Sequence, residues 1–205
     1  MNNKVNVQRM AEMGLLTAIV LILAFTPLGY LKTPWGEEIT FIVVPVAVGA
    51  VILGPKAGAF LGFVFGMTSF AQCFGASPMG AVLLQMNPVG TFVVCVVTRV
   101  FVGLLPALIY QILKKIKIAN VFSVGLCCFL TPLVNTILYI TGSYLIFADA
   151  WMELAVAAGY GGEGGISLLG FMFAMVAVNG IVEAASCLVI ATAVCKALQK
   201  TLHKN

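Results

Sequence analysis

The chain has 205 residues, of which 61% are hydrophobic and 9% are charged, with a formal net charge of +4 and a mean hydropathy of +1.10. Soluble domains carry about 25% charged residues, so this composition excludes a soluble fold and predicts an all-α integral membrane protein. Because a membrane-spanning helix needs about 20 apolar residues, the length allows roughly six or seven spans at most, which predicts one membrane domain over residues 1–205.

Hydropathy and Pro/Gly breakers divide the chain into six predicted membrane-spanning helices. They cover residues 10–28, 40–54, 56–74, 90–113, 120–147 and 166–196. The first apolar run is short enough to resemble a signal peptide, but no small-residue cleavage site precedes a soluble domain, so we expect a retained helix. The connections are predicted to be loops or turns, among them a Pro/Gly-rich first loop, a third loop at 75–88 and a Gly-rich fifth loop at 159–165.

Charged residues alternate between the predicted loops and so indicate an orientation. Basic residues lie on the termini and the even-numbered loops: Lys4, Arg9, Lys56, Lys114, Lys115, Lys117, Lys196, Lys200 and Lys204. Acidic residues lie on the odd-numbered loops, with Lys32 as a basic exception: Glu37, Glu38, Asp149, Glu153 and Glu163. Since cytoplasmic loops are rich in Lys and Arg, we expect both termini, with tails at 1–9 and 197–205, on the cytoplasmic side of a prokaryotic-type plasma membrane.

The sequence lacks the patterns of catalytic and metal sites. The cysteines fall in apolar runs without a CxxC or Cys/His cluster, which predicts small buried side chains: Cys73, Cys95, Cys127, Cys128, Cys187 and Cys195. The single histidine, His203, lies in the basic tail, and no GxxxxGK[ST] phosphate loop is present. We therefore expect no enzyme activity, no cofactor or metal and, because topology explains the basic turn at 114–117, no nucleic-acid partner.

Two ionisable side chains fall inside predicted spans. Because a charge in the bilayer core costs free energy, such residues are candidates for function. Arg99 lies about nine residues into the fourth span, or roughly 13 Å from its outer end, and Glu183 lies near the middle of the sixth. One interpretation is that the two pair and hold the bundle together. The other is that Arg99, alone or with Glu183, supplies charge to a binding site for a polar solute.

Polar residues at helical spacing favour a binding site. Asn135 and Tyr139 are four residues apart in the fifth span, as are Asn179 and Glu183 in the sixth, so each pair shares one helix face. Amides and hydroxyls in hydrocarbon need partners, which either a solute or a neighbouring helix provides.

Three further features have both a structural and a functional interpretation. Asn87 before Pro88 suits a helix cap, but it also lies on the same outer side as the aromatic first loop. Trp35 in that loop suits either the interfacial aromatic belt or a lid over a solute. The small residues Ala11, Gly14 and Ala18 form a stripe that suits packing inside the bundle or docking to a second membrane protein.

Several segments together resemble the substrate-binding S components of energy-coupling factor (ECF) vitamin transporters. The resemblance spans most of the chain and is clearest at residues 44–58 (VPVAVGAVILGPKAG) and 62–70 (GFVFGMTSF). Asn87-Pro88 followed by Arg99, the pair Asn135-Thr136, and residues 179–184 (NGIVEA) are most similar to the pantothenate-type branch.

The resemblance implies a six-helix vitamin-binding subunit that docks on a membrane coupling protein driven by two separate ATPases. It implies that Arg99 binds the vitamin carboxylate and that Asn87, Asn135, Tyr139 and Asn179 bind its amide and hydroxyls. The stripe of Ala11, Gly14 and Ala18 resembles the family's docking motif, with Gly14-xxx-Ala18 in place of the usual Ala-xxx-Ala.

Other functions stay open at this point. Similar S components serve riboflavin, folate and queuosine-type precursors, so the vitamin is not determined. The buried Arg99 and Glu183 also suit a self-sufficient secondary transporter, although the chain lacks the obvious inverted repeats of such proteins. A membrane enzyme would need a reactive cluster that the sequence does not contain.

Overall fold

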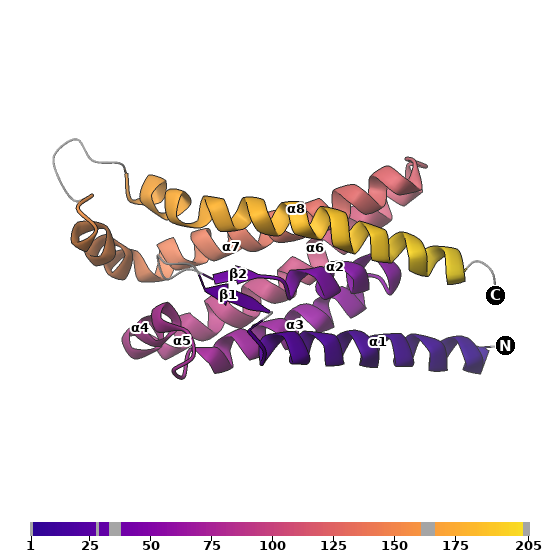
Figure 1. The fold of residues 1–205 in the computed structure, drawn as a ribbon, viewed down its shortest axis with the longest axis horizontal. Coiled ribbons are helices and arrows are strands. Elements are labelled where there is room, and N and C mark those ends of the chain that lie inside the picture. The colour runs from indigo at the N-terminus through magenta and orange to yellow at the C-terminus, as the bar shows by residue number, and fades with distance from the viewer. Residues whose placement is uncertain (1, 28, 33–37, 161–166, 203–205) are drawn as a thin grey trace.

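The computed structural model describes residues 2–27, 29–32, 38–160 and 167–202. It is an elongated helical bundle in which α1 begins and α8 ends at the same end (Figure 1). The elements are α1 (Asn2–Ala24), β1 (Tyr30–Lys32), β2 (Glu38–Thr40), α2 (Val43–Ile52), α3 (Pro55–Gln72), α4 (Pro78–Met86), α5 (Pro88–Phe92), the π-helical segment η1 (Val93–Val97), α6 (Thr98–Lys115), α7 (Asn120–Ala157) and α8 (Leu168–Leu202).

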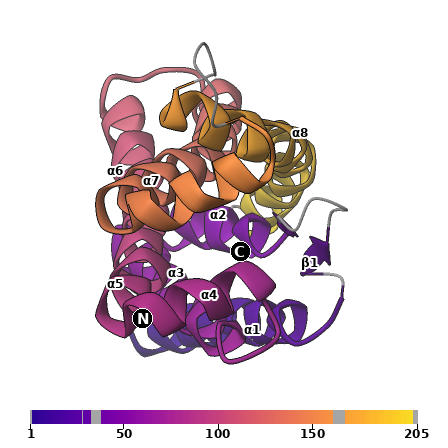
Figure 2. The same cartoon turned by 90° about the vertical axis from the view of Figure 1, so that its left-hand side faces the viewer.

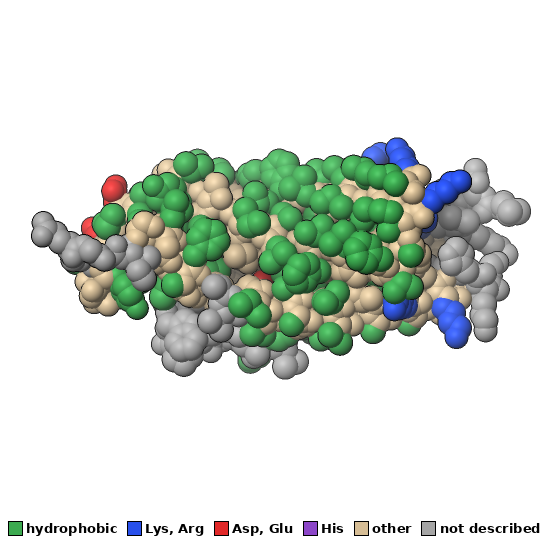
Figure 3. All heavy atoms as spheres, turned by 90° about the horizontal axis from the view of Figure 1, so that it is seen from above, with side chains coloured by type: hydrophobic (Ala, Val, Ile, Leu, Met, Phe, Trp, Pro, Cys, Tyr) green, Lys and Arg blue, Asp and Glu red, His purple; other side chains and the backbone are tan. Residues whose placement is uncertain are grey.

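Four stretches within the described residues are long and apolar enough to cross a membrane. They are Val7–Ala24 in α1, the continuous rod of α5, η1 and α6 (Pro88–Lys115), α7, and Asn179–Thr201 in α8. On the face seen in Figure 3, hydrophobic side chains extend along the length of the bundle, as the composition requires. The prediction of a helical membrane fold is confirmed to this extent.

The other two predicted spans correspond to helices that are shorter or less apolar. The span at 40–54 corresponds to α2, which has 10 residues and is therefore about 15 Å long, half the thickness of a bilayer core. The span at 56–74 corresponds to α3, which has 18 residues. α2 lies in the middle of the bundle between α1 and α8 (Figure 2) and contacts α1, α3, α6, α7 and α8. Eight of its residues are buried, which explains why its sequence is apolar on every side.

The predicted loops and boundaries need three corrections. The prediction of a loop at 75–88 is wrong, because α4 forms there with Ser77 as its N-cap and Pro78 in its first turn. The first loop contains a short antiparallel hairpin in which Tyr30 pairs with Thr40 and Lys32 with Glu38. The fifth span was predicted to end at 147, where Phe147 does leave helical geometry (φ −128°, ψ 31°), but α7 continues beyond this kink to Ala157.

The closest helix packing joins α3 to the rod that contains η1 and α6. Gly58, Gly62 and Gly66 lie four residues apart on one face of α3, and we call them the glycine ridge. A Cβ atom on Gly58 would overlap the carbonyl of Gly103, and a Cβ on Gly62 would overlap the carbonyl of Arg99. The two backbones therefore touch directly, which only residues without a side chain allow.

The ends of α6, α7 and α8 are joined by a closed ring of side-chain hydrogen bonds. Tyr110 OH donates to Asn120 Oδ1 (3.1 Å), Asn120 Nδ2 donates to Gln199 Oε1 (2.7 Å), and Gln199 Nε2 donates to Tyr110 OH (3.1 Å). All six cysteines are buried and free, as predicted, and Cys127, Cys128, Cys187 and Cys195 belong to the main hydrophobic core.

The glycine ridge makes a stability prediction. Gly58→Ala should destabilise the protein by about 1–3 kcal/mol, the usual cost of overpacking, because the new methyl group meets the backbone of α6. Gly14→Ala is the matched control, since a Cβ at Gly14 has no neighbour within 4 Å. Unfolding in a denaturing detergent measures both variants, and equal stability of the two would contradict the contact.

Candidate functional site

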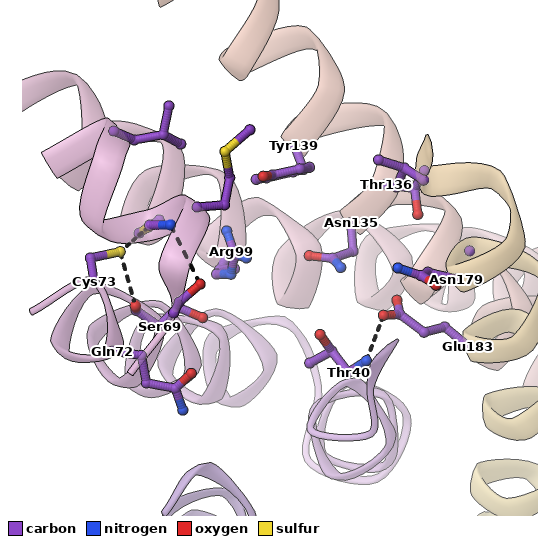
Figure 4. A pocket seen from close by; sticks show the side chains of 17 residues that line it. Thr40, Ser69, Gln72, Cys73, Arg99, Asn135, Thr136, Tyr139, Asn179 and Glu183 are labelled. Carbon is purple, nitrogen blue, oxygen red and sulfur yellow. Dashed lines mark hydrogen bonds between the residues drawn. The ribbon is translucent and has the colours of Figure 1, made fainter. Parts of the chain in front are cut away.

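A polar cavity lies between α3, α4, the η1–α6 rod, α7 and α8, with β2 at its edge (Figure 4). Its volume is about 100 Å³, or about 820 Å³ when the open space between its walls and at its mouth is included. The lining residues are Thr40, Ser69, Gln72, Cys73, Ser77, Met79, Gly80, Leu83, Cys95, Arg99, Asn135, Thr136, Tyr139, Val176, Asn179, Gly180 and Glu183.

Arg99 brings a positive charge to one wall of the cavity. Its Nη1 donates to the carbonyl of Val94 (2.9 Å), which also accepts from the hydroxyl of Thr98. The guanidinium Cζ lies 5.0 Å from the ring centroid of Phe65 and 6.0 Å from that of Tyr139. Val94 belongs to η1, and such π-helical insertions are frequent at functional sites because they change the helix register locally. The aromatic rings and the π-helical carbonyl thus hold Arg99 in place.

Asn179 and Arg99 each bring a buried polar atom without a protein partner to the cavity. Asn179 is only 3% exposed, yet neither its Nδ2 nor its Oδ1 has a hydrogen-bond partner. The Nε of Arg99 is likewise buried without one. Because an unsatisfied buried polar group costs about 1–3 kcal/mol, these atoms indicate a site that a polar solute completes.

Glu183 lies on the other side of the cavity from Arg99, next to the first loop (Figure 4). Its Oε1 accepts a hydrogen bond from the backbone N–H of Thr40 (2.7 Å), and its side chain is 5% exposed. Arg99 and Glu183 form no ion pair in the described part of the chain; Arg99 instead donates to Val94. The two side chains thus face the same cavity without a direct ion pair, and Glu183 joins α8 to the hairpin.

The structure brings together five of the predicted site residues, namely Arg99, Asn135, Tyr139, Asn179 and Glu183. Asn87 does not line the cavity; it is exposed and caps α5, accepting from Gly90 N–H (2.9 Å). Trp35 lies outside the described residues. Ala11, Gly14 and Ala18 are exposed on α1, away from the cavity.

Sequence reasoning missed several polar lining residues. Thr40 from β2, Ser69 and Gln72 from α3, and Thr136 from α7 complete the polar walls. Thr136 follows Asn135 directly, in the pair that resembles the pantothenate-type branch. Of these four residues, it is therefore the one that the sequence could have indicated. Gln72 also donates to the carbonyl of Ala24 (2.8 Å), which ties the end of α3 to the end of α1.

The arrangement suits binding of a small polar anion rather than chemistry on it. A guanidinium matches a carboxylate, and the amides of Asn135 and Asn179 match amide and hydroxyl groups farther along the cavity. Leu83 and Val176 supply apolar walls. No cluster of three or more potential metal ligands occurs among the residues that the structure describes.

Comparisons with known proteins agree with a solute-binding role. A family model described as ECF transporter, substrate-specific component, matches residues 8–195. The chain is similar to the pantothenic acid transporter PanT of Lactococcus lactis subsp. cremoris, with 30% identity over 197 residues that cover 91% of each protein. It is also similar to the pantothenate transporter PanT of Leuconostoc mesenteroides subsp. mesenteroides, with 25% identity over 182 residues, 88% of this chain and 83% of that protein.

The Thr40–Glu183 hydrogen bond makes a prediction about the hairpin. Glu183→Leu removes a charged acceptor, worth about 1.5–3 kcal/mol, so amide hydrogen exchange at Thr40 should accelerate about 10- to 100-fold. Glu183→Gln keeps an acceptor oxygen and should accelerate exchange less. The amide of Phe41, which donates to Gly29 O (3.1 Å), is the internal control and should stay protected. An unchanged Thr40 rate in the leucine variant would contradict this contact.

Proposed function

The chain belongs to the substrate-specific component family of ECF transporters, and from that premise we propose that it is the pantothenate-binding subunit of an importer in the plasma membrane. The observation that carries the choice of solute is the cavity, which sets the guanidinium of Arg99 against the unpaired amide of Asn179. The names of both relatives support the same vitamin.

Pantothenate contains a carboxylate at one end, an amide in the middle, and two hydroxyls beside a dimethyl carbon at the other end. In the proposed pose, Arg99 binds the carboxylate and Tyr139 flanks it, while Asn135 and Asn179 exchange hydrogen bonds with the amide and hydroxyls. Leu83 and Val176 then contact the dimethyl group. The solute thereby satisfies the atoms that the protein leaves without partners.

We further propose that the chain crosses the membrane six times, with α2 and α3 as the second and third spans and both termini in the cytoplasm. Lys and Arg side chains gather at the end of the bundle where the termini lie, and acidic side chains at the other end (Figure 3). This distribution follows the positive-inside rule. In the proposed orientation, the cavity, which lies toward the acidic end, faces the outer side of the membrane.

Transport by this subunit would require partners. The exposed stripe of Ala11, Gly14 and Ala18 on α1 is the proposed contact with a membrane coupling protein, because small residues allow a second helix to approach closely. Two separate ATPases would supply the energy, since the sequence contains no phosphate loop of its own.

Arg99 allows a sharp test of the solute. Arg99→Gln should weaken pantothenate binding by at least about 30-fold, because truncating one partner of a desolvated charge pair costs about 2–5 kcal/mol. The same variant should bind panthenol, the alcohol analogue without the carboxylate, as the wild type does. Lys115→Gln, a charge change outside the cavity, is the matched control. Calorimetry measures the affinity of the purified wild type and of both variants for each ligand. An equal loss of affinity for pantothenate and panthenol in Arg99→Gln would limit Arg99 to a structural role.

A transport assay separates the proposed subunit from a secondary transporter. The second function is favoured by one observation, that Arg99 and Glu183 share the cavity without pairing. Liposomes that contain this chain alone should bind radiolabelled pantothenate but neither accumulate it nor hydrolyse ATP. Accumulation driven by a proton gradient would instead identify a self-sufficient transporter. Riboflavin or folate retained by the purified chain would reassign the vitamin.

A further inference from the structure

An apolar groove runs along the face of α1 that is turned toward Phe60 of α3. Two adjoining hollows of about 620 and 670 Å³ share Arg9, Met13 and Phe60. The second continues past Gly14 and Ala18 to Leu21. We call this continuous surface the α1–α3 groove.

The groove has the length of one lipid leaflet. From Arg9 to Leu21, α1 rises about 18 Å at 1.5 Å per residue, and half of a bilayer core is about 15 Å. The surface at Gly14 is open, because a Cβ atom built there meets nothing within 4 Å. It is therefore long and open enough for an extended acyl chain.

Two cations stand at the end of the groove nearer the termini. Arg9 and Lys56 both line the first hollow and are exposed, and Gln111 lies beside them with an amide donor. Neither cation forms an ion pair within the part of the chain that the structure describes. Glu12, the acidic residue next to Arg9 on α1, instead accepts a hydrogen bond from Gln8 Nε2 (3.0 Å). Two cations and an amide form a donor set that matches a phosphodiester.

We propose that the α1–α3 groove binds one anionic phospholipid of the phosphatidylglycerol type. Its phosphodiester lies at Arg9 and Lys56, and one acyl chain lies against Gly14 and Ala18. A zwitterionic lipid has the same tail but carries its own cation, so the two protein cations favour the anionic headgroup. The lipid covers the stripe proposed for docking, so docking of a coupling protein requires that this lipid leave.

Native mass spectrometry of the full chain, titrated with phosphatidylglycerol or phosphatidylcholine, tests the headgroup site. The wild type should retain phosphatidylglycerol in preference to phosphatidylcholine. Each cation near an anionic lipid is worth about 1 kcal/mol, so Arg9→Gln with Lys56→Gln should weaken phosphatidylglycerol binding about 30-fold and abolish the preference. Lys114→Gln with Lys115→Gln removes the same charge at the end of α6, outside the groove, and should leave binding unchanged.

Gly14→Leu tests the acyl-chain part of the groove. A Cβ atom at Gly14 meets nothing within 4 Å, so the variant should fold, with melting temperature as the check, and should bind both lipids less tightly. Equal losses in the groove pair and the control pair would assign the effect to general charge attraction and overturn the proposal. Unchanged lipid binding by the Gly14→Leu variant would also overturn it. So would a wild-type protein that forms a dimer and retains no lipid. None of these measurements depends on which vitamin the cavity binds.

Discussion

The direct backbone contact between α3 and α6 determines where the charge of the cavity lies. Gly62 packs on the carbonyl of Arg99, so the main chain of Arg99 has a fixed distance from α3. The side chain then extends past Phe65, which belongs to the same helix as the glycine ridge. In a membrane, helices gain little from excluding water between them, so this close approach depends on van der Waals contact over the ridge. A methyl group there would move the guanidinium as well as the helix.

The polar atoms that line the cavity without partners reduce the stability of the protein. Both amide atoms of Asn179 and the Nε of Arg99 lack partners while they are shielded from water. Each such group costs about 1–3 kcal/mol, and the cost is recovered only when a molecule with matching donors and acceptors enters. The ring of Tyr110, Asn120 and Gln199 joins the ends of α6, α7 and α8, the three helices that carry Arg99, Asn135 and Asn179. A solute that supplies matching donors and acceptors would therefore gain this free energy on binding.

Residues that are rare in apolar helices could be predicted as part of the site, and common ones could not. Arg99, Asn179 and Glu183 are costly in hydrocarbon, so their position in a span is a signal by itself. Ser69 and Thr40 are ordinary residue types, and only the packing of α3 and the hairpin brings them to the cavity. The helices were predictable from hydropathy, whereas α4 was not, because its nine residues are too few to show a clear period. The two strands, with three residues each, are likewise too short to show a hydrophobic period.

The two ends of the molecule are connected by the same pair of helices that carries the backbone contact. α3 supplies Phe60 to the α1–α3 groove and Ser69 to the cavity, and α6 supplies Gln111 to the groove and Arg99 to the cavity. Because their backbones touch at Gly58 and Gly103, little side-chain freedom exists between them to absorb a displacement. A movement of one helix at the groove must therefore carry the other with it. A partner or lipid could then influence the solute site only by shifting the α3–α6 pair as a unit. The position of Arg99 would in that case depend on which molecule is bound at the α1 face.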